Sequence, residues 1–431
     1  MNISLALTNV KALQAFQLMR QGSIILTGIL LAKSTIGLNA IGQYEILFFI
    51  GTTLSIFWVN SMLQGLLSMY PKLEFTQQRD LIFNTYVTIL GTSILMLLCF
   101  FVGKNWLLPM LTGQDDIPYF WLYFLFFTIN LPAYLVEYIY LLDNRPKHIF
   151  GYGIFSFGLQ FVVIVLPIFL GYTFREAFIC LIILGALKHL WALWLVFRKG
   201  KPSFDSSLLR PYWKIVVPLI GVAVMGGFTL FFDNWLVGYV FKDEGIFAIF
   251  RFGARELPLV TALSIAFGAA LIPEVAKSEA FALGQIKQKS AYLMHFLFPI
   301  SFLLMMTSPR WFPWLFSPEF AESVSIFNVY LLLVISRLVF PNSILVAKKL
   351  TNIQFWATFV GLLFNVVLSA WWVFVFGIIG IAYATIVAFF IEKLIMIIAL
   401  QLRGVKLSSY IPWITWSSYS IGLLVWFWWF G

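Results

Sequence analysis

The sequence predicts an all-α polytopic membrane protein: two pseudo-symmetric six-helix lobes, twelve transmembrane helices in all, and an extra apolar segment at the C-terminus. Of its 431 residues, 61% are hydrophobic and only 11% are charged, a balance that soluble globular domains do not show. The apolar residues form long runs rather than alternating segments of ~10 residues, so helices are expected and not a β-barrel. Basic residues gather in alternate connections, as in membrane proteins with positively charged cytoplasmic loops.

A helix needs about 20 apolar residues to cross the hydrocarbon core of a bilayer. By that measure the predicted spans are 12–34, 42–70, 80–102, 118–141, 148–171, 174–197, 212–241, 245–272, 286–308, 321–346, 352–376 and 377–401. A thirteenth apolar stretch lies at 411–430. The N-terminal residues lack a short apolar segment followed by a small-residue cleavage site, so we expect no cleaved signal peptide.

The connections between these spans alternate in charge. Even-numbered connections hold clusters of Lys and Arg, such as the pair Arg145 and Lys147, whereas most odd-numbered connections hold one basic residue each. This asymmetry predicts that the N-terminus and all even-numbered connections lie in the cytoplasm. The same alternation accounts for the net charge of +10 without a nucleic-acid partner.

The longest polar connection follows the sixth span and predicts a division into two lobes. The expected regions are an N-terminal lobe at 1–198, a cytoplasmic linker at 199–210, a C-terminal lobe at 211–403 and a tail at 404–431. Three pairs of markers have similar offsets: 203 for Gly42 and Gly245, 202 for Pro71 and Pro273, and 205 for Gln160 and Asn365. Such spacing indicates a duplication with parallel repeats, which transporters use to hold a substrate between two lobes.

Four arginines fall well inside the predicted spans: Arg20, Arg251, Arg255 and Arg337. A buried arginine costs at least ~2.5–3.5 kcal/mol in hydrocarbon, so such residues normally face a bundle interior or a wet cavity. Arg251 and Arg255 are four residues apart and are predicted to share one face of a helix that runs to Pro273. Because guanidinium groups match phosphate oxygens bidentately, we expect an anionic, pyrophosphate-bearing ligand. The alternative is that each arginine neutralises a nearby carboxylate and fixes helix packing.

Acidic residues in the spans are candidates for ion coupling, because a membrane-embedded carboxylate can bind Na⁺ or exchange a proton. Asp233 lies about two turns before the predicted end of the seventh span, and Glu45 lies near the end of the second. Glu137 and Glu256 complete the set of ion-coupling candidates. The alternative for Asp233 and Glu45 is an ion pair with Arg20, Arg251 or Arg255. No other cofactor is expected.

Other chemistries have weaker support in the sequence. His148, His189 and His295 have no metal-ligand spacing, so we expect no metal site. Cys99 and Cys180 both lie in predicted spans, which argues against a disulfide framework. His189 beside Lys188 is a candidate base for a membrane-embedded acyltransferase, but no second polar cluster accompanies it.

Three segments carry a resemblance to a known family. They are 20–52, with Ala32-Lys33 and the Gly42-Gln43-Tyr44-Glu45 entry; Asp233 to Tyr239 followed by Gly245 to Ala248; and Asn365 through Gly377 to Thr385. Over about residues 10–400, the chain resembles the polysaccharide-biosynthesis flippases (O-antigen type) of the multidrug/oligosaccharidyl-lipid/polysaccharide exporter superfamily. Lys33 departs from the arginine usual at that position.

The resemblance implies translocation of an undecaprenyl-pyrophosphate-linked oligosaccharide by alternating access. It also implies that Arg20, Arg251 and Arg255 occupy segments comparable to those that line the cavity of related lipid II flippases. We therefore expect a flippase whose substrate contacts are Arg20, Lys33, Arg251, Arg255 and Arg337.

The expected partners are a lipid-linked oligosaccharide, membrane lipids and the polysaccharide polymerase machinery. Two alternatives remain: a multidrug/cation antiporter of the same fold, which would prefer an acidic cavity, and a membrane-embedded acyl- or glycosyltransferase.

Overall fold

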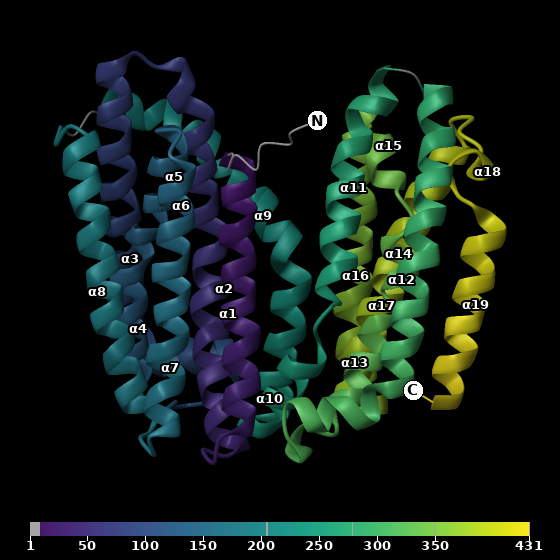
Figure 1. Ribbon diagram of the computed structural model, residues 1–431, viewed down its shortest axis with the longest axis horizontal. Helices are drawn as coiled ribbons and strands as arrows, with labels where there is room; N and C mark the ends of the chain where they lie inside the picture. Colours follow the sequence, from purple (N-terminus) through teal and green to yellow (C-terminus); the bar gives the residue numbers. More distant parts are fainter. Residues whose placement is uncertain (1–8, 204–205, 278, 349, 431) are drawn as a thin grey trace, which may run out of the picture. The chain divides into compact units, whose positions relative to one another are not determined.

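The computed structural model describes residues 9–203, 206–277, 279–348 and 350–430, and all regular secondary structure in these ranges is helical (Figure 1). The contacts within the chain define two compact units. Unit 1 comprises Met1–Gly227 and Gly238–Ala248, and unit 2 comprises Phe228–Val237 and Ile249–Gly431. Both α9 (Ser206–Phe241) and α10 (Glu244–Gly253) contribute residues to both units.

Unit 1 contains four long helices and two interrupted ones. The long helices are α1 (Asn9–Lys33), α2 (Leu38–Met69), α3 (Phe75–Thr112) and α8 (Phe174–Lys199). The fourth predicted span is α4 (Phe120–Asn130), a 3₁₀ turn at Leu131–Tyr134 and α5 (Leu135–Leu142). Pro132 lies in that turn, where its missing N–H is tolerated. The fifth is α6 (Pro146–Gly153), a π-helical turn at Ile154–Gly158 and α7 (Leu159–Phe169).

Gly42 allows α2 to approach the start of α10 within unit 1. A Cβ atom at Gly42 would lie 1.9 Å from the carbonyl oxygen of Glu244, so any larger residue would force the two backbones apart. The neighbouring Gln43 Nε2 donates to Glu244 Oε1 at 3.5 Å. The two segments identified in the sequence as corresponding helix starts therefore lie side by side.

The start of the predicted linker is attached to α3. Arg79 Nη2 donates to the Gly200 carbonyl at 3.0 Å, and Ser203 Oγ donates to Asp80 Oδ1 at 3.1 Å. Residues 204–205 lie outside the described residues. The predicted lobe boundaries around 199–210 stay a prediction.

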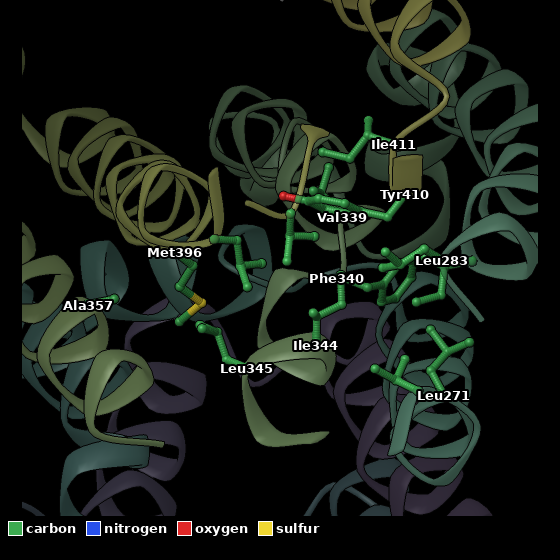
Figure 2. Close-up of a cluster of buried hydrophobic side chains, with 14 residues drawn as sticks. Leu271, Leu283, Val339, Phe340, Ile344, Leu345, Ala357, Met396, Tyr410 and Ile411 are labelled. Atoms are coloured by element: carbon green, nitrogen blue, oxygen red, sulfur yellow. The ribbon is translucent and has the colours of Figure 1, made fainter. Parts of the chain in front are cut away.

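Unit 2 is built from α11 (Pro258–Lys277), α12 (Glu279–Leu315), α16 (Thr351–Phe376) and α17 (Ile378–Gln401), with shorter helices beside them. The shorter helices are α13 (Ser323–Leu331), α14 (Val334–Arg337), α15 (Pro341–Ala347), α18 (Leu407–Tyr410) and α19 (Trp413–Phe430). A buried apolar cluster joins several of them, including Leu271, Phe340, Ile344 and Met396 (Figure 2). Its position holds the junction of α14 and α15 against α11 and α17.

The predicted fold class, an all-α polytopic membrane protein, is confirmed. Among the described residues, ten helices are long and apolar enough to cross a membrane, and the pair 323–337 and 341–347, bent by 42°, would make eleven. Besides the interrupted fourth and fifth spans, two further predicted spans are divided: 245–272 becomes α10 and α11, and 321–346 becomes α13, α14 and α15. Pro258 and Pro341 begin the helices after the breaks, because proline lacks an N–H and disfavours helix at the preceding residue.

Candidate functional site: a buried carboxylate and a basic cavity

Asp233, on α9, is 1% exposed and is surrounded by neutral hydrogen-bond donors of unit 2. Its carboxylate accepts from Thr385 Oγ1 at 2.5 Å, from Asn365 Nδ2 at 3.2 Å and from Ser369 Oγ at the limiting distance of 3.5 Å. No ion pair joins Asp233 to any described residue. The contacts described for the Asp233 carboxylate are thus with hydroxyl and amide groups of unit 2.

The same cluster presents several oxygen atoms. Asn365 is fully buried, and its Oδ1 atom has no hydrogen-bond partner within the described part of the chain. Thr385 Oγ1 also lies 3.1 Å from the Ile381 carbonyl oxygen. Carboxylate, amide, hydroxyl and carbonyl oxygens are the ligands of hard cations such as Na⁺ and Mg²⁺, and one carboxylate balances one positive charge. The donor set therefore fits a monovalent cation or a proton.

Glu256 and Arg337 form a bidentate ion pair in unit 2. Arg337 Nε donates to Glu256 Oε2 at 3.0 Å, and Arg337 Nη2 donates to Oε1. Glu256 Oε2 also accepts from Thr261 Oγ1 at 3.1 Å. The guanidinium carbon of Arg337 lies 4.6 Å from the ring centroid of Phe389. Arg337 is thus paired with a carboxylate, as the alternative interpretation of the arginines expected.

Arg251 and Arg255 do not share a helix face, which corrects the sequence prediction. The helix ends at Gly253, so Arg255 and Glu256 lie in the break before Pro258. The Arg255 side chain instead folds back on α10: its Nε donates to the Arg251 carbonyl at 3.1 Å, and its guanidinium carbon lies 4.9 Å from the ring centroid of Phe252. The structure therefore places the two arginines together through a turn and not through helical periodicity.

Unit 2 also contains a basic cavity of about 270 Å³. Lys393, on α17, is 9% exposed and donates from Nζ to Asn342 Oδ1 at 3.0 Å. Arg337 lies on the same wall, and no acidic side chain is among the described lining residues. The lining comes from α11, the α14–α15 junction, α16 and α17: Thr261, Ser264, Gly268, Arg337, Val339, Phe340, Asn342, Ser343, Val346, Gln354 and Lys393.

The charged candidates of unit 1 form a different arrangement. Glu137 on α5 and Lys188 on α8 are 4% and 5% exposed. Glu137 interacts electrostatically with Arg20 on α1 and with Lys188. Glu45 is buried on α2, whereas Lys33 ends α1 and is exposed. Arg20, Glu137 and Lys188 thus lie near enough in unit 1 for their charges to interact.

Several important residues were not identified from the sequence as site residues. Thr385 and Ser369 looked like ordinary polar residues of apolar helices, and Asn365 served only as a repeat marker. Lys393 donates to Asn342 and its charge interacts with that of Glu392, which itself accepts from Thr358 Oγ1 at 3.0 Å. The sequence did contain one signal for these residues, because a polar residue lies in the middle of each of the spans 352–376 and 377–401.

His189, the candidate base for an acyltransferase, has both ring nitrogens in hydrogen-bonding contact. Nδ1 lies 2.8 Å from the Ile129 carbonyl oxygen, and Nε2 lies 2.9 Å from the Tyr86 hydroxyl. These contacts fit a histidine that joins helices of unit 1. Within the described residues, no group of three or more His, Cys, Asp or Glu side chains is placed to hold a metal ion.

Comparison with known proteins identifies the fold. No protein-family model and no curated protein matches the chain. The solved structure of the lipid II flippase MurJ, in an inward closed conformation, matches with a TM-score of 0.73 and 15% identity, over 95% of this chain and 90% of that chain. An inward-facing multidrug resistance MATE family transporter of the MOP superfamily matches with a TM-score of 0.62 and 12% identity, over 92% and 98% of the two chains.

A MATE transporter from Vibrio cholerae matches with a TM-score of 0.56 and 15% identity, over 92% of this chain and 93% of that chain. At 12–15% identity these matches show the fold alone, and they do not show the O-antigen flippase family expected from the sequence. The chain is a multi-pass membrane protein with the fold shared by the lipid II flippase and the MATE transporters.

Proposed function

We propose that the protein is a flippase that moves an undecaprenyl-pyrophosphate-linked oligosaccharide across the bacterial inner membrane by alternating access. The observation that carries this proposal is the Asp233 cluster. A buried carboxylate held only by neutral donors is expensive in a membrane protein, and such groups normally belong to ion pathways. A transporter fold that contains such a group is suited to coupling substrate movement to an ion gradient.

Cation binding at Asp233 is the coupling step of the proposed cycle. Asp233, Asn365 and Thr385 come from α9, α16 and α17, so a Na⁺ ion or a proton at the carboxylate changes the attraction among three helices. Release of the cation leaves a buried negative charge, which favours another packing of those helices. Differential affinity for the cation between two packings is what an ion gradient requires to drive the cycle.

The substrate class follows from the basic residues. Arg20, Lys33, Arg251, Arg255 and Arg337 are the proposed contacts for the pyrophosphate, since guanidinium groups match phosphate oxygens. The likeness to a lipid II flippase supports a lipid-linked substrate. A cytoplasmic N-terminus and association with the polysaccharide polymerase machinery belong to the same proposal.

A multidrug/cation antiporter is the second candidate, favoured by the likeness to MATE transporters and by the Asp233 carboxylate. An organic cation would then replace the coupling cation. The cavity of unit 2 favours the flippase, because its described lining holds Arg337 and Lys393 and no acid. A cation substrate would meet repulsion there.

Proteoliposomes separate the two functions. We expect an inward Na⁺ or proton gradient to accelerate transfer of a fluorescent polyprenyl-pyrophosphate-linked saccharide between leaflets at least tenfold over protein-free vesicles, with ethidium efflux unchanged. Leaflet transfer is read from quenching by a membrane-impermeant reductant. Gradient-driven ethidium efflux without lipid transfer would reject the flippase in favour of the antiporter.

A further inference from the structure

We propose that the cavity of unit 2 binds a phosphate-type oxyanion, and that the anion competes with Glu256 for Arg337. The cavity lies among α11, the α14–α15 junction, α16 and α17. Identification of the anion as the pyrophosphate of a lipid substrate rests on the proposed function, whereas the binding itself rests on the groups that line the cavity.

Two cations converge on this cavity. The Lys393 ammonium has three N–H donors, and within the described residues it uses one, on Asn342. Arg337 lies close enough to Lys393 for the two like charges to interact. The charge of Glu392, next in sequence, also acts on Lys393, but its carboxylate accepts from Thr358 Oγ1 and is not part of the lining. Because the two positive charges on the lining repel each other, a ligand that contacts both is favoured when it is an anion.

The rest of the lining offers hydrogen-bond donors. Ser264 is 7% exposed, and its Oγ has no hydrogen-bond partner within the described part of the chain. Ser343 and the Gln354 amide lie on other walls of the cavity. A buried hydroxyl without a partner is uncommon and indicates an unfilled position for a water or a ligand atom. A donor-rich lining with two cations matches the several oxygens of a phosphate group.

The size of the cavity limits the ligand. Its volume of about 270 Å³ falls below the ~300–1,000 Å³ of pockets that enclose drug-sized molecules. It therefore suits one phosphate or pyrophosphate group and excludes an oligosaccharide. Val339 and Phe340 line the cavity and also belong to the apolar cluster (Figure 2), so part of its wall is continuous with the buried core of unit 2.

Competition with Glu256 follows from the geometry of Arg337. Glu256 occupies Nε and Nη2, and the guanidinium group has further N–H donors on Nη1. An oxyanion held by Lys393 and Ser264 can take over the guanidinium group, leaving Glu256 with its bond from Thr261. Glu256 lies in the α10–α11 break and Arg337 ends α14 before the second break. Anion binding thus releases a contact that joins two interrupted helices of unit 2.

The test uses the full chain in nanodiscs of phosphatidylcholine, with inorganic pyrophosphate and farnesyl pyrophosphate as probes. Binding is measured by isothermal titration calorimetry, and folding by thermal unfolding. We expect Lys393→Gln to weaken binding of both probes at least tenfold and Ser264→Ala to weaken it about threefold. Glu256→Gln should strengthen binding severalfold, because the competing carboxylate is removed. Lys406→Gln, which removes an exposed lysine outside the cavity, should change nothing.

No binding of either probe by the unaltered protein overturns the inference, as does equal affinity in the Lys393→Gln and unaltered proteins. If Lys393→Gln does not fold, Ser264→Ala and Glu256→Gln decide, and unchanged affinity in both overturns it. Tighter binding of farnesyl pyrophosphate than of pyrophosphate identifies a lipid source for the anion, and equal binding identifies a soluble one. Anion binding without lipid transfer rejects only the flippase, whereas lipid transfer without anion binding rejects only this site.

Discussion

Each unit of the molecule contains a deeply buried carboxylate, and the two are balanced in opposite ways. Glu137 in unit 1 interacts with Lys188 and Arg20, so the protein supplies its counter-charge. Asp233 in unit 2 contacts the neutral side chains of Asn365, Thr385 and Ser369. A carboxylate with built-in cations can be structural, whereas one with neutral donors needs a cation from outside to be balanced. The kind of neighbour, more than the depth of burial, distinguishes a packing charge from a coupling charge.

The largest expected effect comes from removing the charge of Glu137. Glu137→Gln leaves the buried Lys188 ammonium without the acidic side chain whose charge acts on it, and an uncompensated buried charge typically destabilises by about 3–5 kcal/mol. We expect a large fall in the midpoint of thermal unfolding, measured on the purified protein in detergent. The stabilisation of this variant by added Na⁺ or protons should be the same as in the unaltered protein.

The double variant Glu137→Gln with Lys188→Met is the matched control. It removes both buried charges and should recover most of the lost stability. If the double variant unfolds at the same temperature as Glu137→Gln, the loss of stability does not come from leaving the Lys188 charge unbalanced. Glu137 would then not differ from Asp233 in having a counter-charge within the protein.

The next effect concerns ion binding at Asp233. Asp233→Asn keeps the shape of the side chain and removes its charge, so added Na⁺ or a change of proton concentration should no longer stabilise the protein. At a ligand concentration 100 times its Kd, binding stabilises by about 2.7 kcal/mol, and we expect that increment in the unaltered protein alone. Thermal unfolding with Na⁺ against choline, at two pH values, measures it. Retention of the full increment in Asp233→Asn would place the coupling cation elsewhere.

The smallest effect distinguishes residues within the Asp233 cluster. Thr385 Oγ1 lies 2.5 Å from the carboxylate and Ser369 Oγ lies 3.5 Å away. Hydrogen bonds to charged groups contribute about 1.5–3 kcal/mol, so we expect loss of the Thr385 hydroxyl oxygen as a ligand in Thr385→Val to weaken Na⁺ binding about tenfold. Ser369→Ala should have less than a twofold effect on the same titration. The reverse order of the two variants would show that the donors hold the carboxylate differently from the observed geometry.

The fold was largely predictable from the sequence, because hydrophobic length and charge alternation are properties of the chain itself. The spans at 174–197, 352–376 and 377–401 correspond closely to α8, α16 and α17. The helix breaks were harder to place. Pro258 lies within the predicted span 245–272, yet the helix ends at Gly253, and this moves Arg255 and Glu256 out of helical register. Proline indicates that a helix is disturbed but not how many preceding residues unwind.

The candidate site was only partly predictable. Asp233 stands out because any carboxylate within an apolar run is costly, and the same reasoning found Arg337. Their partners are neutral residues such as Thr385 and Asn342, whose types are common in membrane helices and carry no signal by themselves. The choice between a salt bridge and a hydroxyl cage for Asp233 depends on which helices meet, a long-range property that one sequence does not encode in local spacing.

The helices α16 and α17 have a mechanical consequence for the two sites of unit 2. Thr385 and Lys393 lie eight residues apart on α17, and Gln354 and Asn365 lie eleven apart on α16. At 1.5 Å per residue, these separations are about 12 Å and about 16 Å along continuous rods. A continuous helix tilts or rotates as one body over such lengths, so ligand binding at one site also displaces the residues of the other site. By thermodynamic linkage, cation binding at Asp233 and anion binding in the cavity must affect each other equally. The factor by which the cation changes the affinity for the anion equals the factor by which the anion changes the affinity for the cation.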